Sequence, residues 1–227
     1  MKVRYLGHAA FTFSHDAHTL IIDPFLSGNP RAPLKPADVA AQYVLVSHAH
    51  PDHFGDAIEI ARANNATVVS NFEIGTYCQS LGVAAHTMHI GGSHRFPFGT
   101  VKLTIAHHAS TIPTDSGLLT LGNPCGMLVS MGGRTIYHTG DTGLFYDMKL
   151  IGEMNPVDLA LVPIGDNYTM GVADAVKAVE LIRPRAAVPM HYGTFDLIAA
   201  SPEEFVSKVE KLGVASKVLE PGAEMEI

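Results

Sequence analysis

The sequence predicts an α/β protein in which two β-sheets pack face to face and helices cover their outer surfaces. Residues 3–23 and 84–138 contain short alternating apolar patterns that indicate strands, with a strand–helix region between them. From residue 158 onward, strands alternate with helices as in βαβ units. Because an amphipathic helix buries its apolar stripe against a sheet, these regions together indicate two sheets with helices outside.

The composition indicates a single domain spanning residues 1–227. The chain has 227 residues, 47% of them hydrophobic, and no low-complexity linker divides it. With 22 acidic and 15 basic residues the formal charge is −7, so we expect a small-molecule substrate and neither nucleic acid nor membrane as partner. The two cysteines form no CxxC motif and no signal peptide is recognisable, so we expect a cytoplasmic protein. A homo-oligomer is compatible with this composition.

The N-terminal region predicts a three-stranded meander. Its strands are expected at residues 3–7, 9–14 and 19–23, with a turn at residues 15–18. Pro24 ends the third strand, because the residue before a proline is extended and proline cannot continue a ladder. Residues 24–40 contain four prolines and are expected to form a loop.

The remaining elements follow from the same patterns. Further strands are expected at residues 43–46, 67–70, 86–90, 95–98, 101–105, 127–131, 135–138, 158–163, 186–190, 217–219 and 224–227, and helices at residues 54–62, 73–81, 171–183 and 202–212. The helix at 54–62 would bury Ala57, Ile58 and Ala61 on one face. Ser201 supplies the N-cap of the last helix. Residues 109–124 are expected to be a loop that shapes the pocket.

A dense run of polar residues, Ser47-His48-Ala49-His50-Pro51-Asp52-His53, follows the predicted strand at residues 43–46. In an extended segment His48 and His50 point the same way. Pro51 then bends the chain, and the adjacent Asp52 and His53 must diverge. This arrangement can supply two neighbouring metal ions from one loop. The alternative, a polar turn with incidental histidines, would leave three desolvated imidazoles that need partners.

Four ligands on one loop cannot close two metal sites, so we expect others at the ends of further strands. Three strand ends carry candidates, namely His107-His108, His138 with Asp141, and His191. Strand parity leaves His107 and His108 both open, and we favour His108 as the ligand. Asp141 is a good bridging carboxylate; because it already serves that strand end, we favour His138 as a neighbour of the site, with a ligand role as the alternative.

Six short motifs occur along the chain in a fixed order. They are Leu6-Gly7-His8, Asp23-Pro24-Phe25, His48-Ala49-His50-Pro51-Asp52-His53, Ala106-His107-His108-Ala109-Ser110, His138-Thr139-Gly140-Asp141-Thr142 and Pro189-Met190-His191-Tyr192. On these motifs the chain resembles the metallo-β-lactamase superfamily over residues 3–227. Within it, the chain is similar to small stand-alone metal-dependent hydrolases such as L-ascorbate-6-phosphate lactonase.

The resemblance implies a four-layer αββα sandwich with metal ions at one end of the two sheets. Carried over residue by residue, it assigns His48, His50 and His108 to the first ion, Asp52, His53 and His191 to the second, and Asp141 to a bridge between them. It also favours His108 over His107. It makes Asp23 a brace of the ligand loop and puts His8 near the substrate side.

The predicted chemistry is metal-assisted hydrolysis. Imidazole and carboxylate without thiolate suit Zn²⁺, with Mn²⁺ or Fe²⁺ as alternatives. Two ions about 3.5–4 Å apart would hold a bridging hydroxide that attacks an ester, lactone or phosphoester bond. Asp52 would orient this hydroxide and pass on its proton. Asn167, Tyr168 and Thr169, before the predicted helix at 171–183, are candidates for holding substrate; a plain loop is the alternative.

Two other functions compete with this prediction. A nuclease or phosphodiesterase of the same superfamily would need a basic groove, which the formal charge of −7 disfavours. An iron-dependent redox protein would usually replace His50 or lack ligands of the second ion. Both remain alternatives to the hydrolase.

Overall fold

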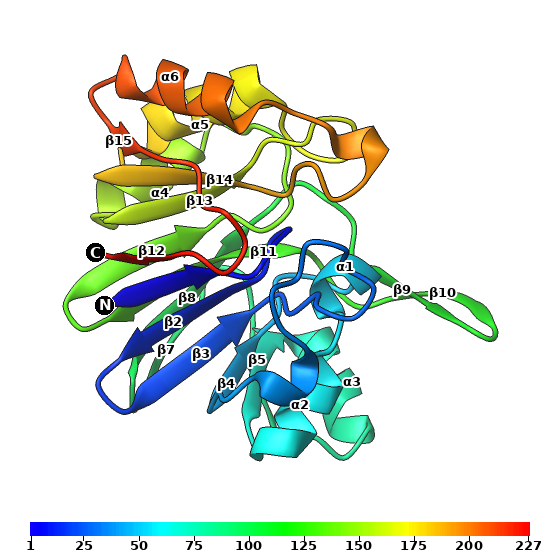
Figure 1. Ribbon diagram of the computed structural model, residues 1–227. Coiled ribbons are helices and arrows are strands. Elements are labelled where there is room, and N and C mark those ends of the chain that lie inside the picture. The colour runs from blue at the N-terminus through cyan, green and yellow to red at the C-terminus, as the bar shows by residue number, and fades with distance from the viewer.

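The computed structural model describes residues 1–227 and consists of two seven-stranded sheets packed face to face with helices on their outer surfaces (Figure 1). The first sheet contains, in spatial order, β16 (Glu224–Glu226), β1 (Lys2–Tyr5), β2 (Phe11–His15), β3 (His18–Ile22), β4 (Tyr43–Leu45), β5 (Thr67–Asn71) and β6 (Ala85–Met88). The second contains β15 (Ala215–Ser216), β14 (Ala186–Met190), β13 (Leu159–Pro163), β12 (Arg134–His138), β11 (Cys125–Met131), β8 (Gly99–Ile105) and β7 (Ser93–Phe96). This confirms the predicted αββα sandwich.

The helices lie outside the sheets. They are α1 (Pro51–Phe54), α2 (Ala57–Asn64), α3 (Phe72–Ser80), α4 (Met148–Met154), α5 (Val172–Ile182) and α6 (Pro202–Glu210), with single 3₁₀ turns η1 (Pro36–Asp38) and η2 (Asp196–Ile198). As Figure 1 shows, α2 and α3 lie beside β4 and β5, whereas α5 and α6 lie beside β13 and β14. None of these helices is long and apolar enough to cross a membrane.

Strand direction brings the functional loops to one end of the sandwich. In the first sheet β3, β4 and β5 run parallel, so the segments after β3 and β4 leave at the same edge. In the second sheet β12, β13 and β14 run parallel. Strand β8 shares their direction because β11 is antiparallel to both β8 and β12. Loops at the carboxyl ends of parallel strands are where ligands of open α/β sheets bind.

The core is divided by the two sheets into three buried clusters. The cluster between the sheets has 24 buried residues, including Tyr5, Phe11 and Phe13 from the first sheet. A second cluster of 19 residues lies under α2 and α3, and a third of 16 residues lies under α4, α5 and α6. Both faces of the sheets are therefore buried at β4 and β13, which explains the continuous apolar runs of these two strands.

The helix predicted at residues 54–62 is wrong in its bounds, because the chain forms two helices there. Pro51 begins α1 inside the run of residues 47–53, the histidine motif. Gly55 separates α1 from α2. Gly55 has φ +38°, and a Cβ at this position would lie 2.5 Å from the carbonyl oxygen of Pro24. The break also rotates the buried face: Ile60 is buried in α2, whereas Ile58 is only partly buried.

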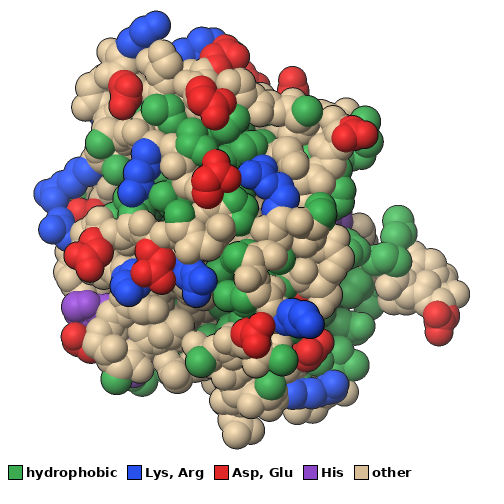
Figure 2. All heavy atoms as spheres, in the orientation of Figure 1, with side chains coloured by type: hydrophobic (Ala, Val, Ile, Leu, Met, Phe, Trp, Pro, Cys, Tyr) green, Lys and Arg blue, Asp and Glu red, His purple; other side chains and the backbone are tan.

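A hairpin and helix α4 are further differences from the prediction. Residues 109–124, expected to be a loop, contain the hairpin β9 (Thr111–Thr114) and β10 (Gly117–Thr120), which projects from the molecule (Figures 1 and 2). Its strands are too short for a periodic signal, and all four residues of β10 are exposed. Helix α4 contains Gly152, which argues against a helix, but a Cβ there would lie 2.0 Å from the Ile182 carbonyl oxygen. Glycine therefore allows α4 to approach α5 closely.

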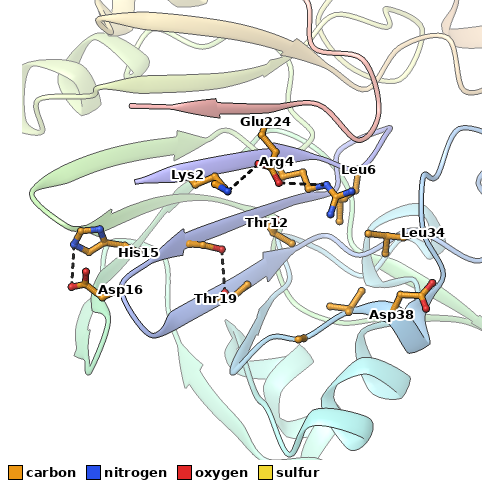
Figure 3. A pocket seen from close by; sticks show the side chains of 13 residues that line it. Lys2, Arg4, Leu6, Thr12, His15, Asp16, Thr19, Leu34, Asp38 and Glu224 are labelled. Carbon is orange, nitrogen blue, oxygen red and sulfur yellow. Dashed lines mark hydrogen bonds and ion pairs between the residues drawn. The ribbon is translucent and has the colours of Figure 1, made fainter.

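The outer surface of strands β1 to β3 carries a broad polar hollow of about 410 Å³ (Figure 3). Lys2 lies 3.1 Å and Arg4 lies 4.0 Å from carboxylate oxygens of Glu224, so the cations of this surface are paired. Residues of the segment after β3, among them Leu34 and Asp38, complete its lining, and none of the predicted ligands lies in it.

Candidate metal centre

The structure brings all of the predicted ligands together at one end of the two sheets. The histidine motif follows β4 of the first sheet, whereas the other ligands follow β8, β12 and β14 of the second. The cluster consists of His48, His50, Asp52, His53, His108, Asp141 and His191. Residues up to 143 positions apart in the sequence therefore meet, as from His48 to His191.

Three imidazoles form the first part of the cluster. His48 Nε2 lies 3.0 Å from His50 Nδ1, and His108 Nε2 lies 3.1 Å from the same atom. A proton on His50 Nδ1 could serve only one of these two nitrogens at a time. Three ring nitrogens facing one another are better satisfied by a single shared cation.

Asp141 connects this group to the second part of the cluster. Its Oδ2 lies 3.0 Å from His191 Nε2, 3.2 Å from His53 Nε2 and 3.7 Å from His108 Nε2. Asp52 Oδ2 lies 3.7 Å from His191 Nε2. The carboxylate of Asp141 thus lies between the two groups, where the resemblance placed a bridge.

Asp23 sets the tautomers of two of these histidines. Its Oδ2 accepts hydrogen bonds from Ser47 Oγ at 2.6 Å and from His53 Nδ1 at 2.8 Å, and its Oδ1 accepts from Ser47 N at 2.7 Å. Because Ser47 Oγ donates to Asp23, it accepts from His48 Nδ1 at 2.9 Å. Both rings therefore carry a proton on Nδ1 and direct Nε2 into the cluster, as metal-binding histidines do. Ser47 was not among the predicted residues.

Several buried polar atoms of the cluster have no hydrogen-bond partner. They are His53 Nε2, Asp141 Oδ1 and both ring nitrogens of His191. The short distances between His53, His191 and Asp141 do not satisfy hydrogen-bond geometry, so these atoms point toward common centres rather than at one another. Buried polar atoms are almost always paired, so this set of donors fits metal ions.

The histidines of the cluster fall into two groups, one with lowered and one with raised pKa values. Burial lowers the pKa of His48, His50 and His108, so these rings are neutral. Burial also opposes charge on His53 and His191, but the Asp141 carboxylate outweighs it, holding the pKa of His53 well above its ordinary value and raising the pKa of His191 to about 9. The neutral rings of His48, His50 and His108 can therefore bind a cation directly. His53 and His191 must first release a proton.

Two other histidines named in the sequence analysis have places that the contacts define. His138 Nε2 donates to the Ala9 carbonyl at 2.9 Å, and Gly140 N donates to His138 Nδ1 at 3.2 Å, so His138 supports the Asp141 turn without touching the cluster. His107 is exposed and its ring lies 5.0 Å from that of Phe145, which places His108, not His107, in the cluster.

The place expected for His8, near the substrate side, stays a prediction, and its contacts are with Asp52 and Thr194. His8 is fully buried, and its ring Nε2 lies 3.1 Å from Asp52 Oδ2. Burial lowers the pKa of His8 to about 4, so the ring is neutral. Its other nitrogen contacts Thr194 Oγ1 at 2.9 Å. The chain offers no sequence signal for Thr194, which lies 186 residues away from His8.

A cavity of about 200 Å³ opens onto the cluster. It is lined by His50, Asp52, His108, Asp141, Tyr168 and His191. Of the three residues predicted to hold substrate, only Tyr168 lines it. Asn167 and Thr169 do not, because this tight turn, with positive φ at Asp166 and Asn167, presents only Tyr168 to the cavity. The segments 24–40 and 109–124, expected to shape the pocket, contribute no lining residue.

The fold and the cluster together define a class of protein, an αββα sandwich with a candidate metal centre at one end. A family model described as "Beta-lactamase superfamily domain" matches residues 2–191. Over 222 residues the chain is 53% identical to a "UPF0173 metal-dependent hydrolase" of Carboxydothermus hydrogenoformans, covering 98% of each chain. Over 229 residues it is 50% identical to one of Desulforamulus reducens, covering 100% of each. The chain therefore belongs to the beta-lactamase superfamily, within its UPF0173 group.

A solved structure is also similar over the whole chain. Igni18, described as a novel metallo hydrolase from the hyperthermophilic archaeon Ignicoccus hospitalis KIN4/I, is 37% identical with a TM-score of 0.90. The match covers 100% of this chain and 98% of that one. The resemblance to the superfamily is thus confirmed, whereas the narrower similarity to ascorbate-6-phosphate lactonase stays a prediction.

Proposed function

We propose that this chain is a metal-dependent hydrolase with two adjacent divalent ions that cleaves an ester, lactone or phosphoester bond of a small molecule. The observation that carries the proposal is the set of buried, unpartnered nitrogen and oxygen atoms that converge from both sheets. The relatives that are about half identical over their full length are named as metal-dependent hydrolases, which supports it.

His48, His50 and His108 would hold the first ion, and Asp52, His53 and His191 the second, with Asp141 between them. This set of imidazoles and carboxylates suits Zn²⁺, with Mn²⁺ and Fe²⁺ as alternatives. When bound, two such ions act as Lewis acids and bring the pKa of water close to neutrality.

Asp52 is the residue best placed to move a proton. Its side chain is 30% exposed and lines the cavity, whereas Asp141 is buried. Burial raises the pKa of the Asp52 carboxyl, but the nearby His191 ring and the hydrogen bond from His8 outweigh this and keep its pKa below the ordinary value. The ionised carboxylate can therefore accept a proton from an attacking water and return it to the leaving group.

The cavity favours an uncharged acyl group over a phosphoester. No lysine or arginine lines it, so an anionic phosphate would depend on the metal ions alone for charge compensation. The cavity volume of about 200 Å³ suits a small group rather than a polymer. The formal charge of −7 also argues against the nuclease alternative.

The test begins with metal analysis of the purified protein, followed by assays with Zn²⁺, Mn²⁺ or Fe²⁺ against lactones, phosphodiesters and thioesters. We expect close to two ions per chain and hydrolysis of a lactone or other acyl compound. Protein that takes up no divalent ion contradicts the proposal. Oxygen consumption by the iron-loaded protein, without hydrolysis of any compound, would favour the redox alternative.

A further inference from the structure

A buried chain of hydrogen bonds runs behind the candidate metal centre through Thr194, His8 and Asp52. Thr194 Oγ1 lies 2.9 Å from His8 Nδ1, and His8 Nε2 lies 3.1 Å from Asp52 Oδ2. His8 is fully buried and Thr194 is 7% exposed. Their contacts join the loop after β1 to the loop after β14, and both loops to the histidine motif.

The direction of these hydrogen bonds follows from the groups involved. The Asp52 carboxylate can only accept, so His8 Nε2 carries a proton and donates it. In the neutral ring, His8 Nδ1 is then an acceptor and the hydroxyl of Thr194 is its donor. Thr194 thereby selects the one neutral tautomer that can bind Asp52.

The main chain of His8 is fixed as firmly as its ring. His191 N donates to the His8 carbonyl at 2.8 Å, and the Tyr5 hydroxyl donates to the same oxygen at 3.1 Å. Both His8 and His191 have a positive φ, +58° and +55°. Residues other than glycine adopt this backbone region only when the surrounding structure imposes it. One residue is thus tied to two of the candidate ligands, Asp52 by its side chain and His191 by its main chain.

We infer that His8 is a positioning residue, set in its tautomer by Thr194, that holds Asp52 in the orientation needed to bind the second ion. Asp52 lies in the first turn of α1 and is 30% exposed, so without an anchor its carboxylate could rotate into solvent. The hydrogen bond from His8 goes to Oδ2, the oxygen that lies 3.7 Å from His191 Nε2, and so holds the carboxylate toward the cluster. This inference rests on the proposed function, since it needs an ion bound at Asp52.

The competing interpretation is that His8 binds the ion directly. Its ring nitrogen lies within 4.8 Å of ligand atoms of Asp52, His53 and His191. The two interpretations differ in what a substitution preserves. The amide nitrogen of glutamine can replace the Nε2 donor toward Asp52, whereas asparagine reaches only as far as Nδ1 and cannot touch Asp52. A direct ligand would be lost in both variants.

The experiment is calorimetric titration of the chelated, metal-free protein with Zn²⁺ alone, for the wild type and two matched pairs of variants. We expect His8→Asn and Thr194→Val to bind one ion as the wild type does and the other about 10–100-fold more weakly, the usual effect of losing a group that orients a ligand. His8→Gln and Thr194→Ser, which keep the required donors, should stay within a few-fold of the wild type. Thermal unfolding of the metal-free variants identifies any that fail to fold. If a His8 variant does not fold, the comparison of Thr194→Val with Thr194→Ser still tests the inference.

The outcomes separate the inference from the proposed function. A wild type that binds no ion contradicts both. A wild type that binds two ions, with His8→Asn and Thr194→Val unchanged, contradicts the inference alone. Equal loss of affinity in His8→Asn and His8→Gln, with Thr194→Val unchanged, also overturns it and identifies His8 as a ligand. An equal loss of Zn²⁺ affinity in Thr194→Val and Thr194→Ser would show that only packing matters at this position. That result would also overturn the inference.

Discussion

Two of the protein's hollows that have polar linings differ in how their charges are satisfied. The larger, about 410 Å³, lies on the outer surface of β1 to β3, and its cations Lys2 and Arg4 share Glu224 (Figure 3). The smaller, about 200 Å³, opens onto the histidine–aspartate cluster, where four buried polar atoms have no hydrogen-bond partner. Size therefore does not identify the functional site, whereas unsatisfied buried polarity does.

The energetic difference between the hollows follows from exposure. Lys2 and Glu224 are 51% and 43% exposed in their side chains, so water solvates them whether or not they pair. Asp141 and His191 are 3% and 2% exposed and can be satisfied only by each other, by protons or by an ion. Substitutions in the two places should accordingly have very different effects, which the following predictions rank.

The largest effect is expected for Asp52→Ala. Loss of the proton acceptor should lower kcat by about 10²–10⁴-fold on the true substrate. The matched control is Glu224→Ala, which removes a carboxylate from the other hollow and should leave the rate within two-fold of wild type. Steady-state kinetics measure both, and an Asp52→Ala variant with near-wild-type kcat contradicts the proposed role.

Asp23→Asn should weaken metal binding about 10–100-fold, because Asp23 orients His53 directly and His48 through Ser47. The amide cannot accept from all three donors in the way that the carboxylate does. Competition with a chromogenic chelator measures the affinity. Asp38→Asn, on the outer surface near η1, provides the control and should bind metal as the wild type does. Equal affinities for the Asp23 and Asp38 variants would show that the brace is unimportant.

Binding of Zn²⁺ or Mn²⁺ should stabilise the folded protein. At a free concentration of about 100 times Kd the gain is about 2.7 kcal/mol, which corresponds to a rise in Tm of about 5–10 °C for a domain of this size. Differential scanning calorimetry of chelated and reloaded protein measures it. An unchanged Tm would mean that the cluster holds no ion in the folded state.

Metal binding should release protons and strengthen as the pH rises toward 9. The pKa of His191 is raised to about 9 and that of His53 is also raised, both above the ordinary value of 6.5, so at pH 7 these rings are protonated in the chelated protein. Their charge stabilises that form fully below pH 6.5, and this contribution is lost as the pH rises through about 9. Calorimetry with Mn²⁺ in buffers of different ionisation enthalpy counts the protons. Affinity independent of pH between 7 and 9 contradicts these shifts.

The smallest effect is expected for Lys2→Ala. Its ion pair with Glu224 is half-exposed, so the free energy of unfolding should change by less than about 1 kcal/mol. Urea denaturation measures the change, and metal content should be unaltered. A larger loss would show that the outer surface contributes more than its exposure suggests.

Local patterns in the sequence predicted much of the fold and of the site. The candidate ligands of residues 48–53 are adjacent along the chain, so a single motif was enough to predict that they lie together. His107 and His108 could not be separated from the residues alone, because strand parity says which residues share a face but not which face meets the other sheet. Thr194 and the buried position of His8 depend on a contact between loops 186 residues apart, for which no local pattern exists. Helix α4 was not predicted because Gly152 disfavours a helix locally. The reason for a glycine there is the close contact with α5, which the local sequence does not show.

The candidate ligands come from both sheets, with the histidine motif on the first and His108, Asp141 and His191 on the second. An ion held by them would fasten the two layers at that end, and separation of the layers there would break its set of ligands and speed its release. Exchange of the ion would then report on transient opening of the sandwich, and radioactive-zinc exchange should accelerate in urea well before the protein unfolds globally.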